Sequence, residues 1–205
     1  MTHRLFTIGH SAMQLPTLLA TLEHSHVSLI VDVRSRPQSF HHPHFDRSHL
    51  ERMLPEAGIS YLFLGDELGG RPDDANAYAS DGVVDYRARR KSYAFRAGLE
   101  RVEQELAKRD LALMCAEEDP LQCHRFLMIS PELVIAGLEP VHIRKGGNLD
   151  SQREAEDRLL KANGFGALAG GSLFSGDRDA ALESAYDAQA KLAAFRIEPA
   201  EAGRW

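Results

Sequence analysis

The chain has 205 residues, of which 43% are hydrophobic and 26% are charged, a length and composition that suit one well-buried globular core with a small appendage. The net charge of −6 argues against a broad nucleic-acid-binding surface, although arginines can still cluster around a local pocket. No apolar run approaches the roughly 20 residues that span a bilayer, and the first residues lack the apolar stretch of a signal peptide. We therefore expect a cytoplasmic protein without a membrane partner, whose two cysteines stay reduced.

Runs of apolar and β-prone residues predict five strands in the first part of the chain. They lie at residues 5–8, 29–33, 59–64, 111–115 and 140–143. Apolar residues at helical spacing predict helices between these strands, at residues 15–22, 50–57, 95–106 and 123–136. Pro55 should bend or end the second helix, and Pro131 is a weak point in the fourth. The regular alternation predicts a three-layer α/β fold, in which a mostly parallel sheet of about five strands carries helices on both faces.

Two segments fall outside this alternation. Residues 65–85 contain a Gly-Gly pair, a proline and several aspartates, and they are too long for a simple connection, so we expect a functional loop or lid. Beyond residue 144, the spacing of Ser151 and Glu154 predicts a capping box at the start of a polar helix, and an alanine-rich amphipathic helix follows at residues 180–194. This part has too little apolar material for a core of its own. We expect residues 1–144 to form the α/β core domain and residues 145–205 a helical extension that packs on it.

Chemically distinctive residues follow directly after the predicted strands. In an open α/β sheet, ligands bind beyond the carboxyl ends of the strands, so these residues should meet at one edge. After the first three strands come His10 and Ser11, then Arg34 and Arg36, then Gly69, Gly70 and Arg71. The fourth strand ends at Cys115 and leads into Glu117, Asp119, Cys123, His124 and Arg125. We expect one concave pocket to be lined by His10, Ser11, Arg34, Glu117, His124 and Arg125.

The segment at residues 115–125 offers groups for several kinds of chemistry. A cysteine at the end of a buried strand, near a helix start whose free N–H groups favour anions, can be a reactive thiol. Glu117 and Asp119 can act as nucleophile, general acid or general base, and His124 can carry protons near neutral pH. Arg125 can bind a phosphate or carboxylate through two hydrogen bonds. Each of these residues also has a purely structural interpretation, as a buried hydrophobe, a helix cap or an ion-pair partner.

Familiar cofactor motifs are missing from the chain. It contains no Gly-x-x-x-x-Gly-Lys-[Ser/Thr] phosphate loop, no Gly-x-Gly-x-x-Gly fingerprint and no Gly-x-Ser-x-Gly elbow. Cys115, Cys123 and His124, together with His10, could supply soft metal ligands, but Cys-x7-Cys-His is not a familiar zinc pattern. We interpret the three histidines within residues 41–44 as incidental. No motif therefore requires a cofactor, its identity stays open, and a transition metal at Cys115, Cys123 and His124 is the alternative.

Several motifs occur in the order typical of a known family. They are Thr-Ile-Gly-His-Ser at residues 7–11, Val-Asp-Val-Arg at residues 31–34 with Pro37, Gly-Ile-x-Tyr at residues 58–61, Leu-Gly-Gly at residues 68–70, Cys-Ala-Glu-x-Asp-Pro-x-x-Cys-His-Arg at residues 115–125 and Val-His-Ile at residues 141–143. Over about residues 4–144, the chain thus resembles the domain of unknown function 488 family. Pro131, in the helix after the Cys-His-Arg motif, departs from the pattern. The resemblance implies a fold and a set of motif residues, without naming a reaction.

Three functions are compatible with these residues. The first is an enzyme, a hydrolase or transferase, that acts on a small anionic or nucleotide-like ligand at the strand edge. Its catalytic candidates are Glu117, Asp119, Cys115, Cys123 and His124, and its substrate-binding candidates are His10, Ser11, Arg34, Arg36, Gly69, Gly70, Arg71 and Arg125. The second is a sulfurtransferase or redox protein that uses Cys115 and Cys123, loosely like a rhodanese, and it requires an accessible thiol near N–H groups. The third is a non-catalytic module that binds a ligand or a protein partner.

Overall fold

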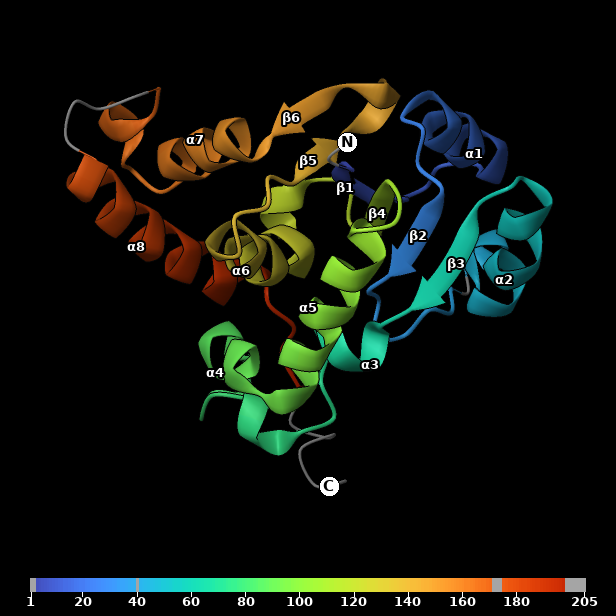
Figure 1. The fold of residues 1–205 in the computed structure, drawn as a ribbon. Helices are drawn as coiled ribbons and strands as arrows, with labels where there is room; N and C mark the ends of the chain where they lie inside the picture. The colour runs from blue at the N-terminus through green and yellow to red at the C-terminus, as the bar shows by residue number, and fades with distance from the viewer. Residues whose placement is uncertain (1–2, 40, 171–174, 198–205) are drawn as a thin grey trace.

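The computed structural model describes residues 3–39, 41–170 and 175–197, which form an α/β fold around one six-stranded sheet (Figure 1). The strands are β1 (Leu5–Gly9), β2 (Leu29–Asp32), β3 (Ser60–Phe63), β4 (Leu111–Cys115), β5 (Val141–Ile143) and β6 (Leu149–Ser151). The α-helices are α1 (Leu15–His24), α2 (Arg47–Glu56), α3 (Gly65–Leu68), α4 (Tyr86–Lys91), α5 (Tyr93–Leu106), α6 (Ser130–Ile135), α7 (Gln152–Ala162) and α8 (Ser175–Ala193). None of these described helices is both long and apolar enough to cross a membrane.

The sheet has the order β3-β2-β4-β1-β5-β6, and its first five strands in this order run parallel. This confirms the predicted α/β fold with a mostly parallel sheet of about five strands. The sixth strand, β6, pairs with β5 in the antiparallel direction and was not predicted. Its three residues include one apolar side chain, Leu149, which is 52% exposed, so they carry no alternating pattern. Gly146 and Gly147, with φ of 79° and 81°, form the turn that brings β6 back beside β5.

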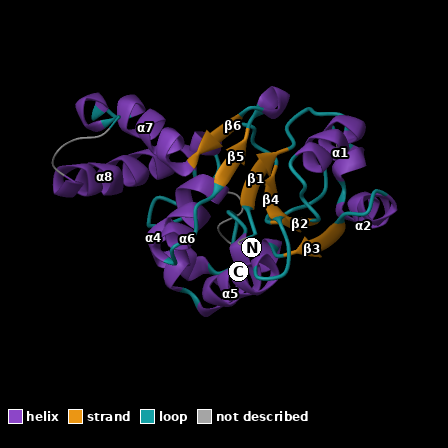
Figure 2. Cartoon of the chain, turned by 45° about the horizontal axis from the view of Figure 1, so that its top comes forward, coloured by secondary structure: helices purple, strands orange, loops and turns teal. Residues whose placement is uncertain are grey.

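Alternate residues of the central strands face two separate cores, one on each side of the sheet. On one side, α1 and α2 pack against the side chains of Phe6, Ile30 and Met114. On the other side, α5 and α6 cover the neighbouring residues of the same strands, including Val31 and Leu113, with α7 and α8 beside them (Figure 2). This period-two alternation is the reason that near-continuous apolar strands can serve both layers.

The segment expected to be a loop or lid begins with the short helix α3, contains the 3-10 helix Ala75–Ala77 and is otherwise irregular, and its first turn is fixed to the core. α3 packs on α5, where Gly98 permits the approach, because a β-carbon at residue 98 would lie 2.8 Å from Cγ of Leu68. Arg89, buried in α4, donates hydrogen bonds to the carbonyls of Asp66 and Glu67 at 2.7 and 2.8 Å. The end of α3 therefore has a defined position, and the residues that follow it reach the strand edge.

The helix predicted over residues 123–136 is divided into two parts. Arg125–Ile129 forms a π-helical turn, and α6 begins at Ser130. Pro131 has no N–H to donate to the preceding turn, and the Ser130 hydroxyl bonds back to the Arg125 carbonyl at 2.9 Å. π-helical turns are rare and occur frequently at functional sites. This one directly follows His124.

α7 and α8 pack on the core formed by the preceding residues. The predicted capping box is confirmed, since Ser151 and Glu154 exchange hydrogen bonds at the start of α7. Leu159 and Leu160 of α7 and Ala185 of α8 are buried in the same hydrophobic cluster as the side chains of α5. The described part of residues 145–205 thus contributes helices and β6 to the structure, and its buried apolar residues join the existing core.

Candidate functional site

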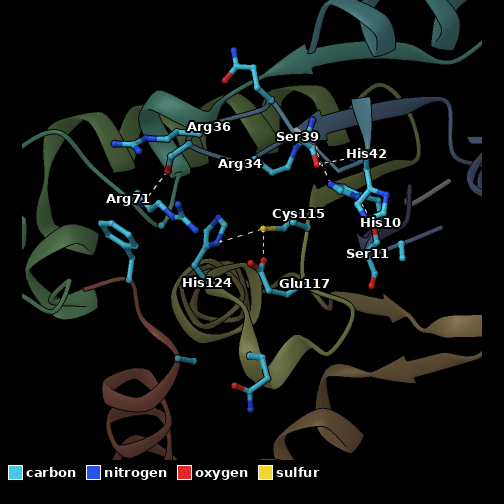
Figure 3. A pocket seen from close by; sticks show the side chains of 18 of the residues that line it. His10, Ser11, Arg34, Arg36, Ser39, His42, Arg71, Cys115, Glu117 and His124 are labelled. Carbon is cyan, nitrogen blue, oxygen red and sulfur yellow. Dashed lines mark hydrogen bonds between the residues drawn. The ribbon is translucent and has the colours of Figure 1, made fainter. Parts of the chain in front are cut away.

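The carboxyl ends of β1, β2 and β4 are held together by backbone hydrogen bonds beyond the strands. The N–H of His10 donates to the carbonyl of Cys115, and the N–H of Val33 donates to the carbonyl of Met114, each at 3.0 Å. A cavity of about 600 Å³, here called the site cavity, opens at this edge (Figure 3). Residues predicted from the sequence that line it are His10, Ser11, Arg34, Arg36, Gly70, Arg71, Cys115, Glu117 and His124.

Gly9 and Arg125 fix the loop that follows β4. A β-carbon at residue 9 would lie 1.7 Å from the carbonyl oxygen of Glu117, so a larger residue cannot occupy this position. Arg125 is fully buried, and its two terminal nitrogens donate to the carbonyls of Glu117 and Glu118. The backbone of this loop is therefore held from both sides, and the carboxylate of Glu117 extends into the site cavity.

Four side chains meet beside the cavity and are named here the Cys-Glu-Cys-His cluster: Cys115, Glu117, Cys123 and His124. The sulfur of Cys115 lies 2.9 Å from a carboxylate oxygen of Glu117 and 3.7 Å from Nδ1 of His124. The sulfur of Cys123 lies 3.4 Å from the same oxygen and 3.8 Å from the same nitrogen. Both cysteines are free and buried, whereas Glu117 is exposed toward the cavity. Three buried groups and one exposed carboxylate thus share one small volume.

The imidazole of His124 is held in a single orientation. Its Nε2 lies 2.9 Å from the carbonyl oxygen of Val33, which accepts a hydrogen bond and so places the ring proton on Nε2. Gly70 lies against the ring, because a β-carbon at residue 70 would be 2.9 Å from Cγ of His124. Nδ1 is consequently directed toward the two sulfurs.

Burial and close contacts set the protonation of the cluster. Burial and the neighbouring Cys123 raise the pKa of the Cys115 thiol well above its ordinary value, so Cys115 is a neutral thiol at pH 7. Burial alone would raise the pKa of Glu117, but the hydrogen bond from Cys115 and the nearby His124 hold it below the ordinary value. Burial alone would lower the pKa of His124, but the interactions with Cys115 and Glu117 outweigh it and raise that pKa. A carboxylate therefore faces two thiols and an imidazole.

Arg34 is buried and almost fully engaged by hydrogen bonds. Its Nε and one terminal nitrogen donate to the two carboxylate oxygens of Asp32 at 2.9 and 2.6 Å, and that terminal nitrogen also donates to the Phe45 carbonyl at 2.8 Å. The other terminal nitrogen lies 3.1 Å from Nε2 of His10. Burial alone would lower the pKa of Arg34, but the bonds to Asp32 raise it, so the guanidinium stays charged. Because its donors are used within the protein, Arg34 serves to position His10 and has little left to donate to a ligand.

His10 is a neutral imidazole with both nitrogens occupied. Its Nδ1 lies 3.0 Å from the carbonyl oxygen of Ser11 and donates to it, so Nε2 accepts the hydrogen bond from Arg34. Burial and the charge of Arg34 lower the pKa of His10 to about 4. The ring stacks on Phe45, with ring centres 4.1 Å apart. His10 is therefore suited to shaping the cavity wall, and its proton cannot be exchanged without breaking these bonds.

Arg36 and Arg71 form an exposed cationic wall on one side of the site cavity (Figure 3). The backbone N–H of Arg71 donates to the Ser35 hydroxyl at 2.9 Å, and its guanidinium lies over the ring of Phe195, 4.6 Å from the ring centre. Within the part of the chain that the structure describes, neither Arg36 nor Arg71 forms an ion pair with a carboxylate. Their charges are available to a ligand.

Residues 14–130 match the family described as Domain of unknown function DUF488. This match covers more than half of the 205 residues. The chain belongs to this family. No curated protein and no solved structure matches the chain. The DUF488 region includes the whole Cys-Glu-Cys-His cluster and the cationic wall, while His10 and Ser11 precede it.

Of the six DUF488-motif side chains expected to share one pocket, five line the site cavity and Arg125 does not. Three other candidates also lie outside its lining. Cys123 joins the cluster without lining the cavity, and Gly69 packs against Ser35, where a β-carbon would lie 2.1 Å from the hydroxyl oxygen. Asp119 is directed instead toward Arg158, whose guanidinium lies 3.2 Å from its carboxylate.

Sequence reasoning missed several residues that line the cavity of this DUF488 protein. They are His42, Tyr86, Gln122, Ala193 and Phe195, among others. His42 lies in the histidine-rich segment that was interpreted as incidental. That segment was the only sequence feature that could have pointed to this residue. Phe195 follows α8, and its carbonyl accepts a hydrogen bond from the N–H of Val84 at 2.9 Å, while Val83 pairs with Arg196 in an antiparallel bridge. Such a long-range pairing leaves no local pattern in the sequence.

Proposed function

We propose that this DUF488 protein is an enzyme, a hydrolase or transferase, that binds a small anionic substrate in the site cavity and acts on it through Glu117. The observation that supports this proposal most directly is a cationic wall and a single carboxylate in the same cavity of about 600 Å³. That volume is typical of sites for metabolite-sized ligands, which place a few polar groups around an otherwise apolar pocket. Glu117 is the only carboxylate among the described lining residues.

Arg36 and Arg71 are the groups that would bind the anion. Both are exposed to the cavity and free of ion pairs with described carboxylates, so an oxyanion can approach them without displacing a partner. A guanidinium binds a phosphate or carboxylate through two parallel hydrogen bonds. The Arg71 guanidinium stacks over the ring of Phe195, and this cation–π contact favours one orientation of the arginine side chain. Arg34 is not proposed to bind the anion, because its donors are already bonded to Asp32 and Phe45.

Glu117 is the group that would act on the bound substrate. Its pKa is held low, so it is present as a carboxylate that can accept a proton or attack an electrophilic centre. The loop backbone around it is fixed by Gly9 and Arg125, which limits the positions that the carboxylate can take. Asp119 has no part in this proposal, since it faces Arg158 on the outside of the cavity.

The thiol alternative has less support from the same geometry. A nucleophilic cysteine needs a thiolate that the substrate can reach. Cys115 is 3% exposed, and burial together with the neighbouring Cys123 raises the pKa of its thiol, which outweighs the opposing effect of His124. A purely ligand-binding function, in turn, does not explain why the carboxylate of Glu117 contacts two thiols.

Anion binding can be measured without knowledge of the reaction. Inorganic phosphate and a nucleoside monophosphate are titrated into the wild type, Arg36→Gln, Arg71→Gln and the control Arg52→Gln, which changes an exposed arginine of α2. Loss of a charged hydrogen bond costs roughly 1.5–3 kcal/mol, so each cavity variant should bind at least about tenfold more weakly. The control should bind like the wild type. Equal affinity in the wild type and in both cavity variants would contradict the proposed anion site.

Turnover then tests the role of Glu117. Metabolites that co-purify with the wild type and are lost from Arg71→Gln, identified by mass spectrometry, provide the substrates for this assay. Glu117→Gln should lower turnover by about 100-fold or more, as expected for loss of a general base or nucleophile. Glu100→Gln, which changes an exposed carboxylate of α5, is the matched control. Unchanged turnover in folded Glu117→Gln would exclude a chemical role for this carboxylate.

A further inference from the structure

The Cys-Glu-Cys-His cluster brings four potential metal ligands into one small volume. Two sulfurs, one imidazole nitrogen and one carboxylate oxygen lie within 4.8 Å of one another. Around a tetrahedral Zn²⁺ with bonds of about 2.0–2.3 Å, neighbouring ligand atoms are about 3.3–3.8 Å apart. The two sulfur–nitrogen separations of 3.7 and 3.8 Å and the Cys123–Glu117 separation of 3.4 Å fall in this range. The Cys115–Glu117 separation of 2.9 Å is shorter, and it involves the one exposed member of the cluster.

The surroundings of His124 are those of a metal-binding imidazole. A ligating histidine usually donates its second ring N–H to a carbonyl or carboxylate, which fixes the tautomer and aims the free nitrogen at the metal. Nε2 of His124 makes this bond to the carbonyl of Val33 at 2.9 Å, and its Nδ1 faces the sulfurs of Cys115 and Cys123. Gly70 leaves room for the ring in this position.

The other ligands are also held by the surrounding structure. Cys115 is the last residue of the buried strand β4, and Cys123 follows the 3-10 helix Pro120–Gln122. Both cysteines belong to the hydrophobic core cluster on one side, and on the other side their sulfurs contact a carboxylate oxygen and an imidazole nitrogen, which packing alone does not require. Thiolate and imidazole ligands select zinc-like ions over magnesium or calcium, which take oxygen ligands.

We infer that Cys115, Cys123 and His124 bind a zinc ion, with Glu117 as the fourth ligand on the side of the site cavity. Cys115 and His124 also line the site cavity, but Glu117 is the exposed member of the four, so water or a substrate anion would exchange with Glu117. Catalytic zinc sites keep one such exchangeable position, whereas structural sites are closed by buried ligands. This inference goes beyond the proposed function and does not depend on it, since metal binding is measured in the absence of substrate.

The wild-type protein, kept under reducing conditions, provides the first test. It should bind one equivalent of Zn²⁺, measured by inductively coupled plasma mass spectrometry after removal of loosely bound metal. With Co²⁺ in place of Zn²⁺, the absorption spectrum should show thiolate-to-cobalt charge-transfer bands and the intense visible bands of a tetrahedral ion. This readout needs no variant, so it holds even if a substitution unfolds the protein. A Co²⁺ complex without charge-transfer bands would overturn the assignment.

Variants identify the ligands. Cys115→Ser and Cys123→Ser should lose stoichiometric binding, whereas Glu117→Gln should keep the charge-transfer bands and bind Zn²⁺ about tenfold or more weakly. The control His24→Asn removes an exposed histidine of α1 that could collect metal adventitiously, and it should still bind one equivalent. Loss of binding in this control, or its retention in both cysteine variants, would overturn the inference. Arg71→Gln should weaken phosphate binding and leave the zinc content unchanged, which separates failure of the anion site from failure of the metal site.

Discussion

Gly70 lies against the imidazole of His124 so closely that a β-carbon at residue 70 would be 2.9 Å from Cγ and 3.0 Å from Nδ1. The ring cannot yield without disturbing its hydrogen bond to the carbonyl of Val33. In Gly70→Ala we therefore expect the ring to turn away from the two sulfurs. Zn²⁺ affinity should fall by about tenfold or more, and the free energy of unfolding by about 1–3 kcal/mol.

Metal titration and urea unfolding measure these two effects. Gly166→Ala is the matched control, because the nearest atom to a β-carbon at residue 166 would be 3.7 Å away, an ordinary van der Waals contact. It should bind Zn²⁺ like the wild type. If Gly70→Ala and Gly166→Ala behave alike, the Gly70–His124 contact has no role in orienting the ring.

Arg125 should matter mainly for stability. Its guanidinium is fully buried and satisfies the carbonyls of Glu117 and Glu118, which Arg125→Met would leave without these donors. An unsatisfied buried acceptor costs about 1–3 kcal/mol, so we expect the free energy of unfolding to drop by about 2–4 kcal/mol. Urea unfolding measures the change, with Arg52→Met on exposed α2 as the control. A variant of wild-type stability that binds phosphate more weakly would instead assign Arg125 to the ligand.

The stability of the fold should fall as pH decreases from about 6.5 toward 4. His142 is buried between Thr7 and Gln152, and burial together with the charge of Arg125 lowers its pKa from 6.5 to about 4. Between these pH values the unfolded chain binds more protons than the folded chain. The contribution of neutral His142 to the free energy of unfolding is therefore complete above pH 6.5 and is lost as the pH falls toward 4. The expected loss from His142 is about 3 kcal/mol.

His142→Gln removes this titration while retaining a polar side chain. Its free energy of unfolding, measured by urea titration at several pH values, should depend less steeply on pH between 4 and 6.5 than that of the wild type. Some dependence should remain, because the pKa of His10 is also lowered to about 4. Asp150 and Arg158 also influence His142, so the measurement is repeated at high salt to screen their charges. An unchanged pH slope in His142→Gln would show that His142 titrates normally.

We propose that residues 1–144 and 145–205 form one folding unit, and truncation tests this. Leu159, Leu160 and Ala185 occupy the core that also holds the side chains of α5, so a chain ending at Arg144 exposes that surface. We expect the truncated chain to bind the dye ANS and to lose a cooperative thermal transition. Limited proteolysis of the full chain provides the complementary measurement. Release of residues 145–205 as a folded, protease-resistant fragment would contradict a single unit.

The fold was largely predictable because its strands are short apolar runs bounded by polar or glycine residues. Residues 29–33 and 111–115 could be recognised from composition alone, since both faces of these strands are buried. α4 and β6 were not recognised. α4 carries three consecutive basic residues in its last turn and depends on Arg89 for its attachment to α3, and β6 pairs through its backbone with little apolar support. Tertiary contacts determine both elements, and local patterns do not report such contacts.

At the site, topology predicted which residues would gather and could not predict where each side chain would point. The strand-end argument correctly placed His10, Arg34 and His124 around one cavity. It could not distinguish Arg125, which binds two backbone carbonyls, from Arg71, which faces the cavity, because both are arginines at strand ends with the same charge. A motif lists residue types, whereas orientation depends on neighbours such as Gly9 and Gly70 that are far away in sequence.

Because Phe195 lies near the end of the described chain, it is synthesised after the other residues that line the site cavity. All four members of the Cys-Glu-Cys-His cluster leave the ribosome well before Phe195, and at roughly 5–20 residues per second this interval lasts several seconds. During that time the cavity lacks the wall that later forms when Phe195 and Arg196 join Val83 and Val84. Cys115 and Cys123 are therefore synthesised before the residues that complete this wall of the cavity. A cation bound by the two sulfurs during this interval would protect them from oxidation.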